Sequence, residues 1–217
     1  MATIPMESHG ELMDQVYRWQ RHFYDASRKF YLLGRDRLIE GLDVPFGGTV
    51  LEIGCGTGRN LVKIAERWPD CRVYGVDIST EMLKSATANI GRADFAQRVV
   101  VGLGDATAFD PTALFGRSKF DRIVCSYTLS MVPEWQAALR RATALLAPQG
   151  ALHIVDFGMQ ENMPLLFKKA LFTWLALFHV APRKELHEYA AAVARAQGLE
   201  FQDHRLYRDY SRMIKIC

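Results

Sequence analysis

Hydrophobic and polar positions along this chain change their period from one stretch to the next. Continuous apolar runs of strand length lie at residues 49–53, 72–77, 99–103, 120–126 and 150–157. Apolar residues recur with the spacing of one helical face at residues 60–67, 80–90 and 133–147. This order of strands and helices predicts an α/β fold, doubly wound around a mostly parallel sheet with right-handed crossovers.

The end of the chain predicts two more strands. Residues 199–201 and 213–216 have strand-like composition, and residues 207–210 would join them as a hairpin. Together with the runs above, this makes a seven-stranded sheet. We find no internal repeat, low-complexity stretch or long linker, so residues 1–217 are predicted to form a single domain.

A segment ahead of the sheet predicts a helical cap over residues 1–45. Tyr17, Tyr24, Tyr31 and Leu38 recur every seven residues and would line one face of a continuous helix. Such a helix could cover the mouth of a ligand site with its tyrosines. The alternative is simple packing of an amphipathic helix onto the domain.

A second segment, residues 159–195, predicts a helical lid inserted before the last two strands. It has basic pairs at 168–169 and 183–184, and residues 162–184 contain no acid. The apolar run between the pairs is twelve residues long, too short for a hydrocarbon core that needs about 20. A buried core helix is one explanation. We favour the other, an interfacial helix that meets anionic lipid or a lipid tail.

The first apolar run ends in a motif that predicts a nucleotide-like cofactor. Residues 51–58 read LEIGCGTG, with glycines at Gly54, Gly56 and Gly58. Alternate glycines let the backbone turn sharply and approach a ligand where a Cβ would collide. The third glycine comes one residue too early for the dinucleotide fingerprint G-x-G-x-x-G. Glu52 would repel a diphosphate but attract an ammonium or sulfonium, so the pattern favours S-adenosylmethionine over NAD.

Two more acids stand at the ends of strand-like runs. Asp77 closes the second run and could accept both ribose hydroxyls of a nucleoside. Asp105 follows the third run and could receive the adenine amino group. Each aspartate alone could equally be a loop cap. With Glu52, however, they make three acids at three successive strand ends.

Charge and composition weigh against several other classes of function. The formal net charge is +3, without the basic stripe that nucleic-acid enzymes show. The four cysteines form no C-x-x-C pair and the histidines lack metal-ligand spacing, which favours reduced thiols and no metal. His153, inside the fifth run, is predicted to be a hydrogen-bonded core residue. The N-terminus has no early apolar run, so we expect a cytoplasmic protein.

The glycine motif, Asp77 and the sequence Gly104-Asp105-Ala106 occur in the order of the cofactor motifs of class I S-adenosylmethionine-dependent methyltransferases, which the chain resembles. The resemblance implies a Rossmann-like sheet that ends in an antiparallel hairpin. It also implies these cofactor-binding residues: Tyr31, Glu52, Gly54, Cys55, Gly56, Gly58, Asp77, Ile78, Met82, Gly104, Asp105, Ala106 and Ser126.

A narrower resemblance rests on residues 17–36, which read YRWQRHFYDASRKFYLLGRD. This stretch resembles the betaine-lipid N-methyltransferases, which convert diacylglycerylhomoserine to diacylglyceryl-N,N,N-trimethylhomoserine. It is similar, more loosely, to phosphoethanolamine N-methyltransferases, in which tyrosines matching Tyr24 and Tyr31 assist the transfer and hold the ligands. The acid that the looser family uses after its fourth strand is not evident here, where residues 126–131 read SYTLSM.

The narrower resemblance implies a lipid acceptor. With the basic and apolar segment described above, it predicts peripheral contact with an anionic membrane surface. A partner enzyme of the same lipid pathway is a further candidate partner, and nucleic acid is not expected.

Repeated N-methylation depends more on positioning than on acid–base groups. Tyr24, which could orient the amine or relay its proton, and Tyr127 are the candidate catalytic residues. A quaternary product cannot donate a hydrogen bond and would be held against aromatic faces such as Phe157, each contact being worth roughly 0.5–2 kcal/mol. Arg35 is the candidate for binding a homoserine carboxylate.

Three other functions stay open. One is a methyltransferase for phosphatidylethanolamine or for a small amine, carboxylate or quinone. Another is a catalytically silent, membrane-associated protein that binds S-adenosylmethionine. The third is an NAD-dependent oxidoreductase, which the glycine spacing disfavours.

Overall fold

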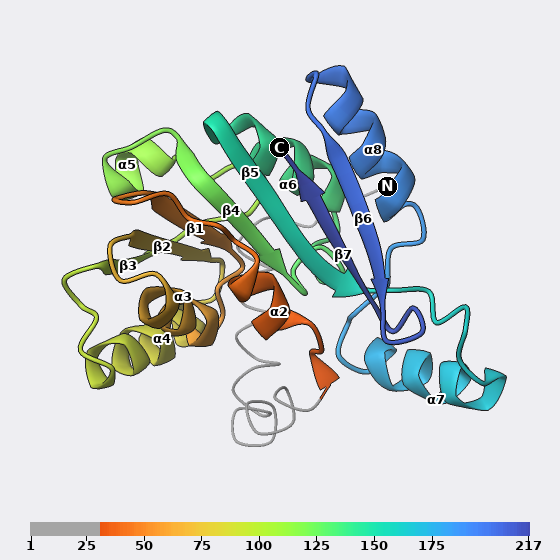
Figure 1. Ribbon diagram of the computed structural model, residues 1–217. Coiled ribbons are helices and arrows are strands. Elements are labelled where there is room, and N and C mark those ends of the chain that lie inside the picture. The colour runs from red at the N-terminus through yellow and green to blue at the C-terminus, as the bar shows by residue number, and fades with distance from the viewer. Residues whose placement is uncertain (1–30) are drawn as a thin grey trace.

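The computed structural model describes residues 31–217, which form one seven-stranded sheet with helices on both faces (Figure 1). The strands are β1 (Thr49–Ile53), β2 (Arg72–Asp77), β3 (Val99–Leu103), β4 (Phe120–Ser126), β5 (Leu146–Phe157), β6 (Phe201–Leu206) and β7 (Ser211–Ile216). The helices are α2 (Arg35–Glu40), α3 (Arg59–Arg67), α4 (Thr80–Arg92), α5 (Pro111–Phe115), α6 (Trp135–Ala144), α7 (Leu165–Ala176) and α8 (Leu186–Ala196). This architecture confirms the predicted doubly wound α/β fold.

The strand order is β3-β2-β1-β4-β5-β7-β6. The first five strands pair in parallel, as the alternation of strands and helices predicts. β7 runs antiparallel between β5 and β6, which confirms the predicted closing hairpin. β6 begins at Phe201, later than expected, because Gly198 (φ 67°) ends α8 and the Leu199 amide still donates to the Ala194 carbonyl (2.9 Å).

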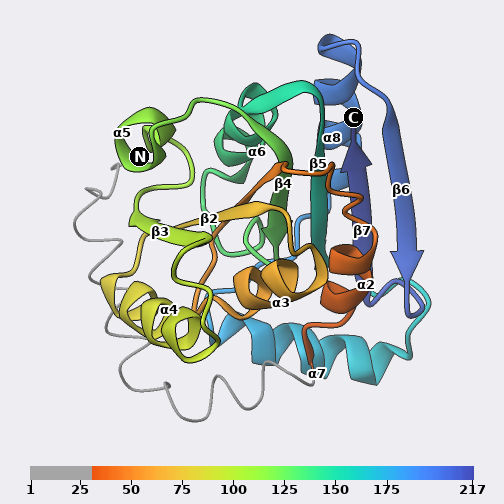
Figure 2. The same cartoon turned by 60° about the vertical axis from the view of Figure 1, so that its left-hand side comes forward.

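Each face of the sheet is covered by its own layer of helices (Figure 2). α2, α3 and α4 pack on one face, and α5, α6 and α8 on the other. β1 lies inside the sheet and is buried along its whole length, so it reads as an apolar run apart from Thr49 and Glu52. Because parallel strands end at the same edge, the loops after β1, β2, β3 and β4 meet there.

The N-terminal segment departs from the predicted continuous helix. Residues 1–30, which include Tyr24, lie outside the described part of the chain. Further on, Gly34 has φ 88° and α2 begins only after it, so the expected helix is interrupted there. A Cβ on Gly34 would lie 3.2 Å from Leu206 Cδ1, and close packing on the sheet therefore adds to the preference for glycine.

The predicted lid over residues 159–195 divides into two helices with different surroundings. α8 buries Leu186 and Ala190 in the core beside α6, so it covers the sheet and is not part of a lid. α7 lies beyond the carboxyl end of β5 (Figures 1 and 2), and Leu175 is its one fully buried residue. Within residues 31–217, no helix combines the length and the apolar character needed to cross a membrane.

His153 lies in β5 and is an uncharged core residue. Its partner across the β5–β7 pair is Lys215, and its Nε2 atom is buried without a hydrogen-bond partner among the described residues. Burial, together with the positive charges of Lys215 and Arg122, lowers the pKa of His153 to about 3. The predicted burial is confirmed, but the expected hydrogen bond at this nitrogen is not present.

Replacing His153 by leucine should make the stability of the fold less dependent on pH. The unfolded chain protonates this histidine near pH 6.5, whereas the folded protein keeps it neutral down to about pH 3. Wild-type stability therefore falls as the pH drops below 6.5. On going from pH 7 to pH 5, the free energy of unfolding of the wild type should fall by about 2 kcal/mol more than that of His153→Leu, as measured by urea denaturation.

The matched control for this experiment is His204→Gln, because His204 is exposed. Its free energy of unfolding should follow that of the wild type across the same pH range. A difference between His153→Leu and the wild type that stays constant with pH would contradict the prediction.

Candidate functional site

The loop between β1 and α3 bends sharply at the carboxyl edge of the sheet. Gly54, Gly56 and Gly58 all adopt the left-handed conformation, with φ of 72°, 53° and 76°. Other residues rarely adopt this region, so the bend requires glycine at alternate positions. The amides of Gly54 and Cys55 both donate to the Val76 carbonyl (2.8 and 3.1 Å), which fastens the loop to the end of β2.

The three glycines have different neighbours. A Cβ on Gly54 would lie 2.5 Å from Thr128 Cγ2, and one on Gly58 would lie 3.1 Å from a Cβ in α4. These two glycines therefore allow the loop to pack against its surroundings. Gly56 donates its amide to Asp77 Oδ2 (2.7 Å). Of the three glycines, Gly56 is therefore the one that we expect the ligand to contact.

Asp77 connects the glycine loop to the helix that follows β2. Its Oδ2 accepts from the Gly56 amide, and its Oδ1 accepts from the Ser79 amide (3.0 Å). Ser79 is the N-cap of α4, and its hydroxyl accepts from the Met82 amide (3.2 Å). The segment from the end of β2 to the first turn of α4 therefore lies beside the glycine loop. It contains three predicted cofactor-binding residues, Asp77, Ile78 and Met82.

The third acid lies at the same edge of the sheet, one strand further out. β3 pairs with β2, and the Gly104 amide donates to the Asp77 carbonyl (2.9 Å). Asp105 Oδ1 accepts from both the amide and the hydroxyl of Thr107, at 2.7 Å each. The structure thus brings Gly104, Asp105 and Ala106 alongside Asp77, as the sequence predicts.

Glu52 lies under the glycine loop, with 1% of its surface exposed. Its Oε1 accepts from the Asn60 side chain (2.7 Å), whereas its Oε2 is buried without a hydrogen-bond partner in the described part of the chain. Burial raises the pKa of Glu52 to about 8; the Asn60 hydrogen bond and the charges of Arg35 and Arg59 oppose this rise, and the charge of Asp77 adds to it. Glu52 is therefore a weak acid at neutral pH, and a cationic ligand would favour its ionised form.

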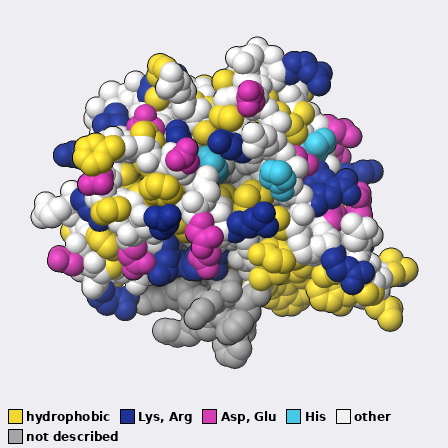
Figure 3. All heavy atoms as spheres, viewed as in Figure 1, with side chains coloured by type: hydrophobic (Ala, Val, Ile, Leu, Met, Phe, Trp, Pro, Cys, Tyr) yellow, Lys and Arg dark blue, Asp and Glu magenta, His cyan; other side chains and the backbone are white. Residues whose placement is uncertain are grey.

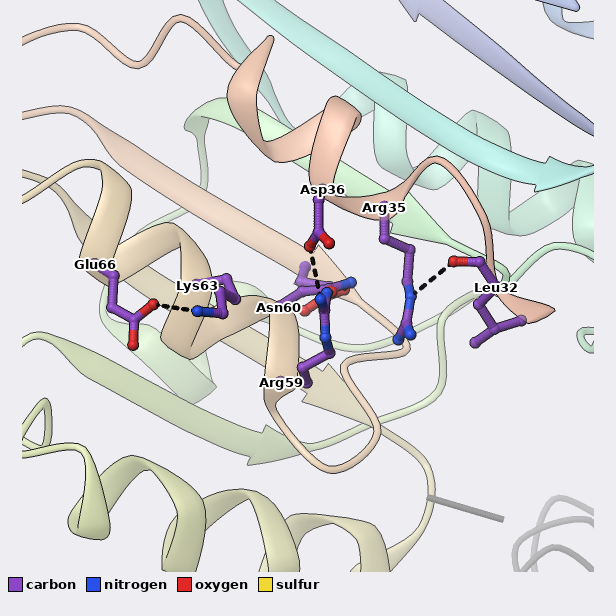
Figure 4. Close-up of polar contacts among 8 residues, drawn as sticks. Leu32, Arg35, Asp36, Arg59, Asn60, Lys63 and Glu66 are labelled. Carbon is purple, nitrogen blue, oxygen red and sulfur yellow. Dashed lines mark hydrogen bonds and ion pairs between the residues drawn. The ribbon is translucent and has the colours of Figure 1, made fainter. Parts of the chain in front are cut away.

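A series of polar contacts links Glu52 to the N-terminal segment. Arg59, the first residue of α3, donates to Asn60 Oδ1 (3.1 Å) and to Asp36 Oδ1 in α2 (2.6 Å). Figure 4 shows the Asp36 and Arg59 side chains pointing toward each other between the two helices. Arg35 donates its Nε to the carbonyl three residues before it (3.2 Å), and its charge lowers the pKa of Glu52. The predicted carboxylate-binding residue thus acts electrostatically on the buried acid.

The rings of Tyr127, just after β4, and Phe157, the last residue of β5, pack against each other. Their ring centroids are 4.6 Å apart, and the Tyr127 hydroxyl donates to the Leu33 carbonyl (2.6 Å). Burial raises the pKa of this hydroxyl well above its usual value. The contact with Leu33 anchors the N-terminal segment and accounts for Tyr127 without catalysis. The roles of Tyr127 in catalysis and of Phe157 in substrate binding stay predictions.

Two other predicted residues stand apart from these contacts. Ser126, at the end of β4, has a buried hydroxyl without a hydrogen-bond partner among the residues described. Tyr24, the other candidate catalytic residue, lies outside residues 31–217, so its role also stays a prediction.

Apolar side chains from three segments meet over the start of α4. Met82 packs against Met131 from the loop after β4 and against Phe178 just beyond α7. Tyr31 packs edge-on against Trp174 of α7, with ring centroids 4.7 Å apart. We call Met131, Trp174 and Phe178 the apolar roof. It contacts two predicted cofactor-binding residues.

The arrangement suits a cofactor with a nucleoside and an amino-acid part. Glu52 Oε2, a buried oxygen without a partner among residues 31–217, offers a place for a cationic group. Carboxylates at the ends of β2 and β3 can accept hydrogen bonds from hydroxyl and amino groups. A diphosphate near the buried Glu52 would instead oppose ionisation of this acid and gain no charge pairing from it. The residues present therefore fit S-adenosylmethionine.

Sequence reasoning did not identify three of the residues that build this site. Asn60 lies within α3, and its contact with Glu52 exists only once α3 folds back over β1. Met131 belongs to residues 126–131, of which Ser126 and Tyr127 were the predicted site residues; a lone methionine in a loop carries no signal of a binding role. Phe178 was part of an apolar run whose length and aromatic content were the signal, and neither reveals its contact with Met82.

Comparisons with known proteins agree with this geometry. The family described as "Methyltransferase domain" (Methyltransf_31) matches residues 46–204. A tRNA1(Val) (adenine(37)-N6)-methyltransferase of Porphyromonas gingivalis is 28% identical over 218 residues, covering 87% of this chain and 86% of the relative. A demethylmenaquinone methyltransferase of Roseiflexus castenholzii is 31% identical over 167 residues, covering 75% and 66%.

A solved structure shows the same fold. The crystal structure of a SAM-dependent methyltransferase from Aquifex aeolicus has a TM-score of 0.65 at 16% identity. The match covers 94% of this chain and 97% of that one, so it extends over nearly all of both.

Gly56→Val should abolish binding of S-adenosylmethionine. A branched side chain at φ 53° strains the bend and occupies the face where the ligand must lie. We expect affinity, measured by isothermal titration calorimetry, to fall by about 100-fold or more, equivalent to roughly 2.7 kcal/mol. Gly116→Val is the control, because Gly116 has φ 67° but no atom within 4 Å of its Cβ position. Near-normal affinity in Gly56→Val would contradict the assigned pocket.

Glu52→Gln should remove a pH dependence from cofactor binding. The folded protein keeps the Glu52 proton up to about pH 8, so the free protein loses stability as the pH rises from 4.5 towards 8. A cationic ligand favours the ionised form, and wild-type affinity should rise by up to about tenfold per unit between pH 6 and 7.5. Affinity of Glu52→Gln should be flat over this interval.

Glu66→Gln is the matched control for that measurement. Glu66 is an exposed carboxylate of α3, paired with Lys63 (2.7 Å). Its removal should leave the wild-type pH slope in place. The same slope in Glu52→Gln would show that Glu52 does not meet the cation.

Proposed function

We propose an acceptor for this chain, which belongs to the methyltransferase domain family and is an S-adenosylmethionine-dependent methyltransferase. The acceptor is the amine of diacylglycerylhomoserine, which the enzyme methylates successively to give the betaine lipid diacylglyceryl-N,N,N-trimethylhomoserine. The competing acceptors are phosphatidylethanolamine and a small amine, carboxylate or quinone. The competing non-enzymatic role is that of a silent, membrane-associated protein that binds S-adenosylmethionine.

The observation that carries this proposal is the apolar roof. Trp174 and Phe178 come from α7 and its end, and they contact Tyr31 and Met82. A small polar acceptor gains nothing from such a wall. Binding of an amine that carries acyl chains is stabilised when their apolar surface is buried against the roof, by roughly 25 cal/mol per Å² of buried surface.

The identity of the headgroup is supported by the stretch at residues 17–36, which resembles the betaine-lipid enzymes. The described end of this stretch lies at the site. Tyr31 contacts Trp174, and Asp36 pairs with Arg59 next to the glycine loop. The segment that carries the narrower resemblance is therefore connected to the segment that carries the cofactor motif.

When bound, S-adenosylmethionine supplies a methyl group activated on a sulfonium centre. The residues of the chain then have to hold the amine deprotonated and in line, so positioning supplies much of the rate. We assign Tyr24 to orient the amine and pass its proton to water. Tyr31 offers an aromatic face to the growing cation, worth roughly 0.5–2 kcal/mol. Arg35 would pair with the homoserine carboxylate.

We further propose that the enzyme is cytoplasmic and associates peripherally with the membrane that contains its substrate. The acyl chains of such an acceptor make its release into water costly, at about 0.8 kcal/mol per CH₂ group. The enzyme must therefore come to the bilayer. The enzyme that produces diacylglycerylhomoserine is the expected partner in the same pathway.

Mass spectrometry of the reaction products tests the acceptor. Purified protein should convert diacylglycerylhomoserine in mixed micelles to products with one, two and three added methyl groups when S-adenosylmethionine is present. Methylated phosphatidylethanolamine, or methylation of soluble amines alone, would overturn the proposal. Absence of turnover with every acceptor, together with normal cofactor binding, would favour the silent protein.

Tyr24→Phe separates catalysis from binding. The variant should lose turnover by about 100-fold, within the range of general acid–base catalysis, and keep its affinity for S-adenosylmethionine. Tyr207→Phe is the control, because Tyr207 is exposed in the β6–β7 turn. Equal turnover in the two variants would remove Tyr24 from the mechanism.

A further inference from the structure

α7 exposes a mostly apolar stripe on one side. Leu166, Ala170, Thr173 and Leu177 follow one another at spacings of four, three and four residues, which places them on one helical face. All four are exposed, Leu166 by 83% and Leu177 by 69%. Leu165, 65% exposed, adds to the edge of this face. We call these five residues the outer stripe, and Figure 3 shows hydrophobic side chains gathered over α7.

The other side of α7 is packed on the protein. Leu175 is fully buried, and Leu171 and Trp174 pack against the same core cluster. A helix that is apolar all round is normally enclosed by protein or lipid. Here protein covers only one side, so the outer stripe is a large apolar surface without a partner among the described residues.

Cations accompany the outer stripe, and residues 162–184 contain no acid. Lys168 and Lys169 lie in the first half of α7. The acid that precedes the segment, Glu161, is paired with Arg205 (2.7 Å). The surface around the stripe is therefore positive.

The second basic pair contributes less than the sequence indicates. Arg183 turns inward, and its guanidinium donates to the carbonyls of Leu129 (3.0 Å) and Val132 (2.8 Å). Lys184 is exposed.

Lys168 is half-buried two turns before the buried Leu175, so it lies on the packed face of α7, and its ammonium is over the Phe172 ring (5.5 Å). Of the two lysines of α7, Lys169 is exposed and flanks the outer stripe. The positive charge beside the stripe therefore rests on Lys169.

We propose that the outer stripe, flanked by Lys169, docks the enzyme on an anionic lipid bilayer. The leucines enter the boundary between headgroups and acyl chains, and the ammonium group of Lys169 lies among the phosphates. A second copy of the chain fits this surface less well, because a two-fold interface would include Lys169 of both copies and no acid to pair with it from residues 162–184. The inference rests on the proposed function, since it names the surface through which the enzyme reaches a lipid acceptor.

Docking through the outer stripe also positions the site. Trp174 and Phe178 of the apolar roof are carried by α7 and the turn that ends it. A bilayer in contact with the outer stripe would lie one helix diameter from the roof, about 10 Å. An acceptor amine could then reach the cofactor while its acyl chains stay close to the membrane.

Sedimentation with vesicles tests the docking surface on the full chain. The wild type should bind vesicles of phosphatidylglycerol and phosphatidylcholine at least about tenfold more tightly than vesicles of phosphatidylcholine alone. Lys169→Gln should weaken binding by about fivefold, whereas Lys168→Gln, on the packed face, should leave it unchanged. Leu166→Glu with Leu177→Glu should weaken it by at least about tenfold.

Phe46→Glu is the matched control. Phe46 is 89% exposed and precedes the amino end of β1, whereas α7 follows the carboxyl end of β5. This variant should bind vesicles as the wild type does. Affinity for S-adenosylmethionine and the melting temperature should be unchanged in all of the variants, which excludes unfolding as the cause.

Two results would overturn the docking surface. One is wild-type binding to vesicles by the leucine variants. The other is a wild-type dimer that the leucine variants convert to monomers without loss of vesicle binding, which would make the stripe a self-interface.

A soluble substrate separates this proposal from the proposed function. With a short-chain, water-soluble diacylglycerylhomoserine, the leucine and lysine variants should turn over at the wild-type rate. If the wild type binds vesicles through the stripe but methylates no such substrate, the docking surface stands and the proposed acceptor fails. If the substrate is methylated and the leucine variants still bind vesicles, the docking surface fails alone.

Discussion

The carboxylate of Asp77 holds the carboxyl edge of the sheet together. One oxygen accepts from the Gly56 amide and the other from the Ser79 amide. A loop of left-handed residues has no repeating hydrogen bonds of its own, so such contacts decide its shape. Hydrogen bonds to a charged group contribute about 1.5–3 kcal/mol each. The Gly104 amide donates to the backbone carbonyl of Asp77 (2.9 Å), so the glycine bend, the start of α4 and the end of β3 all meet at this residue.

Glu52 gives the site a different property, because it is an acid that burial keeps protonated. One of its carboxyl oxygens accepts a hydrogen bond from Asn60, and the other has no partner among the described residues. Arg35 and Arg59 partly offset the cost of ionisation. Arg35 is the first residue of α2, and Arg59 of α3 pairs with Asp36 of α2. The N-terminal segment and the floor of the cofactor site are therefore linked by charge. Any change in the position of α2 alters the acid strength of Glu52.

The sequence predicts the sheet well because interior parallel strands are apolar on both faces and stand out as continuous runs. The meeting of Glu52, Asp77 and Asp105 at one edge follows from the same topology. Other features depend on partners far along the chain. The break at Gly34 reflects packing against Leu206, and no local pattern reports it. Three other features also depend on contacts between residues far apart in the sequence: the different roles of the glycines, the burial of Glu52, and the hydrogen bond from Tyr127 to the Leu33 carbonyl.

α7 carries the outer stripe and Trp174 of the apolar roof, and Phe178 lies just beyond its end. In the proposed docking, contact with a bilayer and access to the reacting amine would therefore be coupled through a rigid element. With such a helix, the relevant concentration of acceptor is its density within the plane of the membrane. Diluting the acceptor with inert lipid would slow the enzyme, whereas diluting the whole suspension of vesicles with water would mainly lower the amount of enzyme bound. If the enzyme docks as proposed, its catalysis would be two-dimensional, and the composition of the leaflet would become a means of regulation.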